Sequence, residues 1–244
     1  MVHPAGIAAS GAVALVAVYL QSGRAPYALA PSPGDALGAL RIGLLQHGTL
    51  LGAALSAFLA GTSMGEDLRL GTVETWRFSD PRWLRRWLRR VSVLVVLLIA
   101  SAVLSAVVLR LLAAPHASGG PTSFRDLWVD ALPSLAAIVL FASASLTASF
   151  FVRDPLLLVL LAVTLLTMPS RLGGALGHWA LPAAWIGTGL HLTENGTSIN
   201  YLAQQSGSLT RLPSQAIGLS FIGAATLAAL FLGARLSEPR SRRR

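Results

Sequence analysis

The sequence predicts an all-α, polytopic membrane protein with six transmembrane helices. Hydrophobic residues make up 54% of its 244 residues and charged residues only 12%, about half the usual charged fraction of a soluble domain. A soluble domain of this length would have too little polar surface to cover so much apolar material. Long uncharged runs, separated by clusters of Arg, Pro and Gly, point to the same class. We expect a single transmembrane domain over residues 1–244.

The absence of two residue types excludes several kinds of site. The chain has no cysteine, which excludes disulfides and thiolate metal sites. All nineteen basic residues are arginine, and the phosphate-binding loop of ATPases needs a lysine after its glycines. The net charge of +9 is compatible with nucleic-acid binding. Because the arginines flank apolar runs, however, we expect them to border a membrane, and we expect no nucleic-acid partner.

Six apolar runs have the length or the flanking residues of a membrane span. The first has only just enough residues, and a signal peptide is the alternative interpretation, although no basic segment precedes it. Segments rich in Pro and Gly, 24–41 and 116–130, are predicted to be loops. The predicted spans cover approximately residues 5–21, 42–64, 91–114, 132–152, 155–169 and 216–236.

One further stretch, residues 171–190, has no charge from Leu172 onward and is interrupted by glycines and by Pro182. It fits either a seventh span or a re-entrant external segment. Cytoplasmic loops carry the excess of Arg, and the arginine-rich parts are the segment 65–90, Arg153 and the C-terminal tail. Six spans place these parts on the same side, whereas a seventh would put the tail outside. We therefore expect a re-entrant segment, with both termini on the cytoplasmic side of a bacterial plasma membrane.

The charged segment 65–90 lies between the second and third predicted spans. Ser63 and Glu66 have the spacing of a capping box, so a short helix is expected to begin at Ser63 and run to Leu70. Glycine inside a helix costs about 1 kcal/mol relative to alanine, so we expect a bend at Gly71. The acidic residues of this segment would face away from the membrane.

The second half of the segment has the pattern of a membrane-surface helix. Asp80 is placed to cap it and Pro81 to occupy its first position. Trp and Leu then alternate with Arg, so that rings would lie at the level of the lipid headgroups and guanidinium groups would meet phosphates. Membrane lipids are thus expected partners. The predicted membrane-interface residues are Trp83, Arg85, Arg86, Trp87, Arg89 and Arg90.

The charged segment also resembles part of a known family. Residues 66–74, Glu-Asp-Leu-Arg-Leu-Gly-Thr-Val-Glu, followed by Asp80-Pro81 and a basic helix, are similar to the cytoplasmic segment after the second span of type-2 ABC exporter permeases. That family's pattern is an acidic residue, then Gly-Thr, an apolar residue and Glu, then a Pro and basic residues before the third span. The six-span count and the broken external segment are also similar. One departure is that no basic amphipathic helix precedes the first predicted span.

The resemblance implies a mechanism. Two six-span permease subunits, identical or homologous, would pair, and each would dock on a separate ABC ATPase subunit that binds ATP and Mg. The bent helix would be the coupling element, inserted into a groove of that ATPase. This chain would bind no cofactor and catalyse no reaction itself. The coupling residues would be Glu66, Asp67, Leu68, Arg69, Gly71, Thr72 and Glu74.

The expected function is export of a hydrophobic or amphipathic substrate, such as a drug, antibiotic, lipid or peptide. A permease for haem or another cytochrome-assembly cargo is an alternative within the resemblance. A stand-alone secondary transporter or channel is another, but such proteins place ionisable groups near the middle of the membrane, and the sequence predicts none there. An intramembrane serine protease is disfavoured because no histidine follows Ser220 to act as its base.

Two polar residues, Gln46 and His47, interrupt the second predicted span near its external end. They are candidates for the substrate pathway, since polar groups inside membranes are often functional; a partly hydrated structural pair is the alternative. His191 and Glu194 lie three residues apart without a third ligand, so no metal site is expected.

Overall fold

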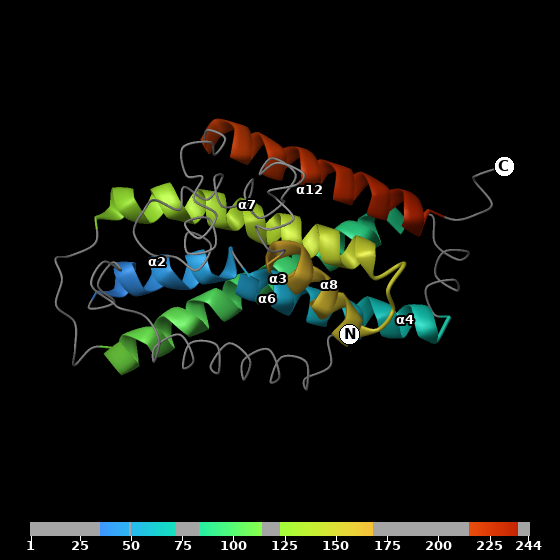
Figure 1. Cartoon of the computed structure of the whole chain (residues 1–244), viewed down its shortest axis with the longest axis horizontal. Coiled ribbons are helices and arrows are strands. Elements are labelled where there is room, and N and C mark those ends of the chain that lie inside the picture. Colours follow the sequence, from blue (N-terminus) through green and yellow to red (C-terminus); the bar gives the residue numbers. More distant parts are fainter. Residues whose placement is uncertain (1–34, 49, 72–82, 114–122, 168–214, 239–244) are drawn as a thin grey trace.

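The computed structural model describes residues 35–48, 50–71, 83–113, 123–167 and 215–238. Every regular element in these ranges is a helix (Figure 1), which confirms the all-α class for the described part of the chain. The predicted first span and the segment 171–190 lie outside the described residues. The helices are α2 (Ala36–His47), α3 (Leu50–Ala60), the π-helix η2 (Gly61–Gly65), α4 (Glu66–Arg69), α6 (Trp83–Ala113), α7 (Phe124–Ala148), α8 (Pro155–Thr167) and α12 (Gln215–Ser237).

Three of the described helices are long and apolar enough to cross a membrane, which identifies an integral membrane protein. These stretches are Trp83–Leu111 in α6, Ala131–Ala148 in α7 and Ser220–Ser237 in α12. A fourth span is present if the bent pair formed by α2 and α3 crosses as one. The predicted fifth span coincides with α8, a shorter apolar helix.

The second predicted span, 42–64, is a bent pair of helices in the structure. Its first half, α2, begins at Ala36 inside the predicted loop, because the Asp35 side chain caps it and accepts a hydrogen bond from the Gly38 N–H at 2.6 Å. This half ends at His47, and α3 continues from Leu50 at an angle of 58°.

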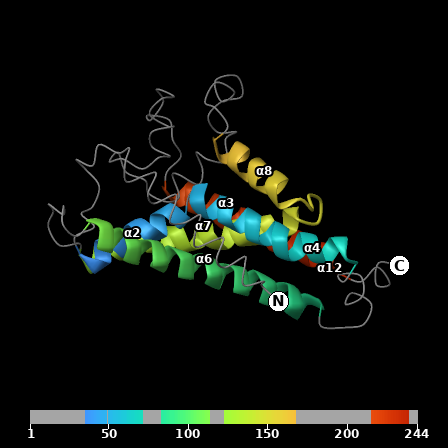
Figure 2. The same ribbon diagram turned by 90° about the horizontal axis from the view of Figure 1, so that it is seen from below.

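The two halves of this broken span pack against different neighbours. Helix α2 contacts α6 most extensively, and α7 next. Helix α3 contacts α8 most extensively, then α7, and has much less contact with α6. Figure 2 shows this division, with α8 beside α3 on the side away from α6. Helix α12 lies along α7, on the side of α7 that faces away from α2 (Figure 1).

Two helix boundaries also differ from the prediction. Helix α6 is one continuous helix from Trp83, so the expected surface helix and third span are parts of the same element. Helix α7 starts at Phe124, within the predicted loop 116–130, and keeps Pro133 inside it. The loop was predicted from Gly and Pro residues at 119–121, and Pro133 already lay inside the predicted span 132–152.

The interior of the bundle combines apolar side chains with small hydroxyls. Apart from His47, every buried polar side chain among the described residues is a serine or threonine. Hydrogen bonds join three helix pairs: His47 in α2 to Ser101 in α6, Ser56 in α3 to Ser145 in α7, and Thr147 in α7 to the carbonyl of Ala229 in α12. Small residues and interhelical hydrogen bonds are typical of packing between membrane helices.

Candidate functional site at the charged end of the bundle

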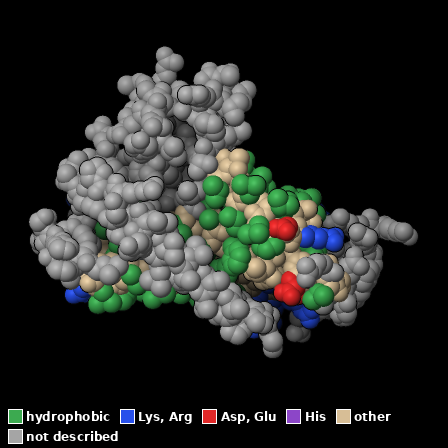
Figure 3. Space-filling model, turned by 60° about the horizontal axis from the view of Figure 1, so that its bottom comes forward, with side chains coloured by type: hydrophobic (Ala, Val, Ile, Leu, Met, Phe, Trp, Pro, Cys, Tyr) green, Lys and Arg blue, Asp and Glu red, His purple; other side chains and the backbone are tan. Residues whose placement is uncertain are grey.

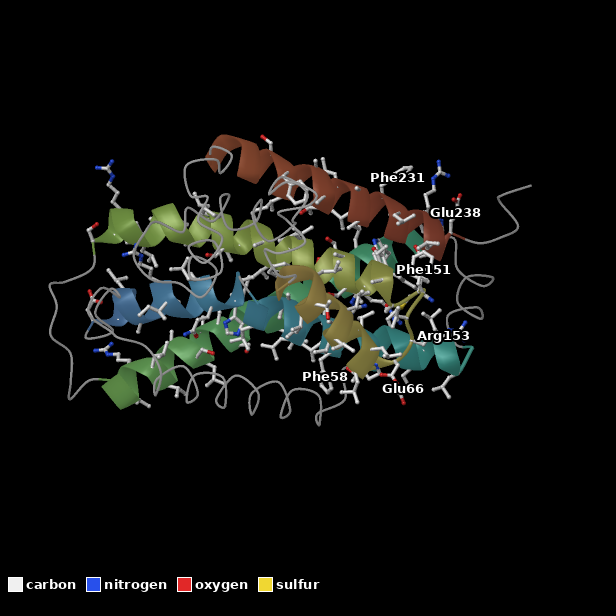
Figure 4. All side chains as sticks on the ribbon, in the orientation of Figure 1. Phe58, Glu66, Phe151, Arg153, Phe231 and Glu238 are labelled. Atoms are coloured by element: carbon white, nitrogen blue, oxygen red, sulfur yellow. The ribbon has the colours of Figure 1, made fainter. Side chains whose placement is uncertain are left out.

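The charged ends of several helices gather at one end of the bundle. Helix α4, the start of α6, the turn between α7 and α8, and the last turn of α12 all lie there (Figure 1). Glu66, Arg153 and Glu238 mark this end in Figure 4. In the space-filling view the described surface is mainly apolar, and most of its visible charged side chains lie toward this same end (Figure 3). The described parts of the predicted coupling segment therefore share one end with Arg153.

The helix leading into the coupling segment does not begin at Ser63, so the predicted capping box is wrong. Helices α3, η2 and α4 follow one another without interruption. The Ser63 hydroxyl donates to the Leu59 carbonyl at 2.7 Å within the helix, instead of capping a new one. The helix ends where the sequence predicted a bend. The Leu70 N–H still bonds to the Glu66 carbonyl, and Gly71 adopts φ of 70°, a conformation that glycine takes at little steric cost.

The described coupling residues divide into exposed and anchored positions. Glu66 and Leu70 are exposed, Leu70 by 64%. Leu68 packs against the main apolar cluster, and Asp67 makes an ion pair with Arg90. Arg69 is the last residue of α4. Thr72 and Glu74 lie outside the described residues.

Arg90 ties the end of α4 to the start of α6. One guanidinium nitrogen, Nη2, donates to Asp67 Oδ2 at 2.5 Å, and the other, Nη1, lies 3.0 Å from the sulfur of Met64. The prediction that Arg90 serves only the membrane interface is thus incomplete, because Asp67 occupies its guanidinium. The two side chains are 29% and 32% exposed, so the pair stabilises the fold by about 1 kcal/mol at most. Its main effect is to fix where α4 ends.

The predicted interface helix exposes its arginines but not all of its aromatic rings. Leu84, Arg85, Arg86, Leu88 and Arg89 are exposed, and Trp83 is half-buried.

Trp87 is the exception, and its predicted position at the lipid headgroups is wrong. Its side chain is 0% exposed and belongs to the main apolar cluster. The ring lies 5.9 Å from that of Phe150, centroid to centroid, and against Gly233 of α12. Its Nε1–H finds no hydrogen-bond acceptor among the described residues. Trp87 therefore joins α6 to α12 and to the end of α7 instead of facing lipid.

A close backbone contact joins η2 to the turn before α8. A Cβ atom added to Gly61 would lie 2.6 Å from Pro155 Cα, and one added to Gly65 would lie 2.5 Å from the Arg153 carbonyl oxygen. Only glycine permits this approach. The spacing Gly61-x-x-x-Gly65 is the signal in the sequence that predicts such packing, and the residue-by-residue interpretation of the charged segment did not use it.

The two candidates for the substrate pathway lie at the break between α2 and α3. They are the last two residues of α2. Gln46 is half-buried and His47 is fully buried. His47 Nδ1 lies 2.9 Å from the Gly43 carbonyl and Nε2 lies 3.0 Å from the Ser101 hydroxyl. The structure thus places a buried ionisable side chain at the break between α2 and α3.

The described residues contain no group of three or more His, Asp or Glu that could hold a metal ion. The residues His191 and Glu194 lie outside the described part. No family model, no curated protein and no solved structure matches the chain.

Proposed function

We propose that the chain is the membrane-spanning permease subunit of an ATP-binding-cassette exporter. It would pair with a second permease subunit in a bacterial plasma membrane and receive energy from a separate ATPase subunit. The observation that carries the proposal is the end of α4, where Glu66 and Leu70 are exposed while Asp67 is held by Arg90. A short acidic helix that is held through one carboxylate, Asp67, and exposes another, Glu66, is suited to enter a groove of a partner.

The substrate class follows from the character of the interior. Apart from His47, the buried side chains of the described helices are apolar or carry small hydroxyls, so a hydrophobic or amphipathic molecule would meet few unfavourable contacts along the bundle. A molecule with an unpaired charge would lose its hydration without gaining a partner there. ATP and Mg would be bound by the partner, since this chain has no lysine for a phosphate-binding loop.

Co-purification with an ATPase encoded beside this chain tests the proposal. We expect Glu66→Ala and Glu74→Ala to reduce complex formation or ATP turnover. Glu238→Ala is the control, because Glu238 is an acidic residue at the same end of the bundle that directly follows α12 and pairs with Arg235. Unchanged turnover and unchanged complex formation in both test variants would argue against a coupling role.

A stand-alone secondary transporter is the second candidate, and one observation favours it. His47 lies at a break between two half-helices, and secondary transporters place ion and substrate sites at such breaks. Transport by the purified chain alone, in liposomes with a pH gradient and no ATPase, would support this function over the first.

A further inference from the structure

The turn between α7 and α8 exposes two large side chains at the charged end of the bundle. Phe151 is 68% exposed and Arg153 is also exposed (Figure 4). The turn is anchored on both sides of these residues. Before them, the ring of Phe150 lies 5.9 Å from that of the buried Trp87. After them, Asp154 Oδ1 accepts hydrogen bonds at 2.8 and 3.1 Å from two N–H groups in the first turn of α8.

The same turn lies against the helix that carries Glu66. A Cβ atom added to Gly65 would lie 2.5 Å from the Arg153 carbonyl oxygen, and one added to Gly61 would lie 2.6 Å from Pro155 Cα. Two backbones therefore meet without side chains between them. Because Glu66 directly follows Gly65, it and Arg153 belong to adjoining surfaces. Their backbone positions are set before any partner binds, which lowers the cost of binding.

Glu66 and Arg153 have opposite charges, but neither uses its charge within the described part of the chain. Neither side chain makes an ion pair or a hydrogen bond with another described residue. By contrast, the neighbouring Asp67 is held by Arg90. One carboxylate and one guanidinium are thus presented on adjoining elements, and each can meet an opposite charge on the same partner.

The charges around Arg153 favour a protein partner over a lipid headgroup. Asp154 is the next residue and is exposed, and Glu66 is exposed on the adjoining helix. Both carboxylates would repel the phosphate of a lipid that approached Arg153. The start of α6 is different, because its exposed arginines have no acidic residue among them, and such a basic segment suits anionic lipids.

We propose that Phe151 and Arg153 form a second contact for the ATPase subunit that receives the end of α4. The partner would present a carboxylate to Arg153, a basic side chain to Glu66, and apolar side chains to Phe151 and to Leu70, which is 64% exposed. This inference rests on the proposed function, because it takes the ATPase as the partner. It deepens that function by adding the turn between α7 and α8 to the docking surface.

The affinity of the chain for the ATPase encoded beside it tests the contact of Arg153. In nanodiscs we expect Arg153→Gln to weaken this affinity by about tenfold, as for the loss of one well-placed arginine at an interface. The variant should fold, because Gly65 is contacted by the Arg153 carbonyl, which the substitution keeps. Arg235→Gln is the matched control, since Arg235 is an exposed arginine in the last turn of α12 whose charge is paired with Glu238. Its affinity should be unchanged.

A photo-cross-linker identifies what lies against Phe151. p-Benzoylphenylalanine replaces Phe151 in one sample and Phe231 in the control. Phe231 is a phenylalanine of similar exposure, 64%, within the membrane-spanning part of α12. We expect cross-links to the ATPase from position 151 and none from position 231. Adducts with lipid at position 151, together with an unchanged affinity of Arg153→Gln, would overturn the proposal in favour of a lipid contact.

The variant Glu66→Ala separates failure of this inference from failure of the proposed function. If Glu66→Ala weakens the complex but Arg153→Gln does not, and position 151 gives no cross-link to the ATPase, the second contact is wrong and the exporter function stands. If the unaltered chain forms no complex with the ATPase, the exporter function is wrong and the second contact is wrong with it.

Discussion

The imidazole of His47 uses both of its nitrogens in the interior of the bundle. A carbonyl can only accept a hydrogen bond, so Nδ1 donates its hydrogen to Gly43 across one helical turn. In the neutral ring, Nε2 is then left to accept the hydrogen bond of the Ser101 hydroxyl. The arrangement fixes the tautomer and holds the last turn of α2 against α6. It also explains how a polar ring is tolerated at a fully buried position.

We expect this hydrogen bond to contribute measurably to stability. Ser101→Ala and His47→Ala should each lower the free energy of unfolding, with a coupling between them of about 0.6 kcal/mol and at most about 1.7, the range found for bonds between membrane helices. A double-mutant cycle of unfolding in detergent measures the coupling. Ser92→Ala is the control, because Ser92 is exposed on the same helix and bonds only to its own helix carbonyl. Strictly additive losses would contradict the prediction.

For single residues, the sequence predicted the local backbone conformation better than the surroundings of the side chain. Gly71 was predicted to interrupt its helix because glycine disfavours a helix interior, and that property is local. Ser63 was misassigned because a capping box and a mid-helix serine have the same spacing, and only the preceding turn distinguishes them. The environment of Trp87 depends on α12, which follows it by more than a hundred residues and brings Gly233 against the ring. Spacing within one helix contains no information about that contact.

At the start of α6, the sequence likewise predicted the helix correctly but not what its aromatic face packs against. The periodicity predicted a helix with aromatic and basic faces, and a helix is present. Its aromatic face turns inward at Trp87, because the first turns of α6 pack beside α12 and the end of α7. The element that was predicted to lie on the membrane surface is therefore also part of the core.

Trp87→Ala should accordingly destabilise the protein strongly. Removing a buried tryptophan costs about 3–5 kcal/mol through lost burial and the cavity left behind. Leu84→Ala and Leu88→Ala are the controls, because both side chains are 46% exposed on the same turns of α6, and we expect their effects to be within about 0.5 kcal/mol. Thermal unfolding in detergent compares the three variants. An equal loss of stability in all three variants would contradict the buried position of Trp87 and would support a position at the membrane surface.

The apolar helices themselves were largely predictable, whereas the break in one of them was not. Helices α6, α7 and α12 coincide with predicted spans because long apolar runs have few alternatives in a membrane. In the second span, Gln46 and His47 stand out as polar residues, but the apolar residues around them keep the whole window hydrophobic. Whether the chain bends there depends on the neighbours of each half, and those lie in α6 and α8.

For the whole molecule, the distribution of arginine predicted which segments lie on the same side. The segment 65–90, Arg153 and the C-terminal tail were assigned to one side from their arginines alone. In the structure, α4, the start of α6, the turn at Arg153 and the last turn of α12 lie at the same end of the bundle (Figures 1 and 4). The agreement has a physical basis, because the charge rule acts on loops and helix ends.

Single cysteines test this arrangement in intact cells. We expect Glu66→Cys, Asp154→Cys and Glu238→Cys to resist a membrane-impermeant maleimide added outside, and to react once the membrane is opened. Ser123→Cys, just before α7 at the opposite end, should react from outside. The parent chain has no cysteine and is the blank. Labelling of Glu66→Cys from outside would show that the predicted orientation is wrong and would contradict the coupling role.

The break after His47 also bears on how the protein enters the bilayer during synthesis. The first half, α2, contains 12 residues, and a helix needs about 20 apolar residues to cross the hydrocarbon layer. Helix α2 alone is therefore not a sufficient insertion signal for the translocon. Helix α2 can therefore insert stably only after α3 has also left the ribosome. Its main packing partner, α6, is synthesised later still.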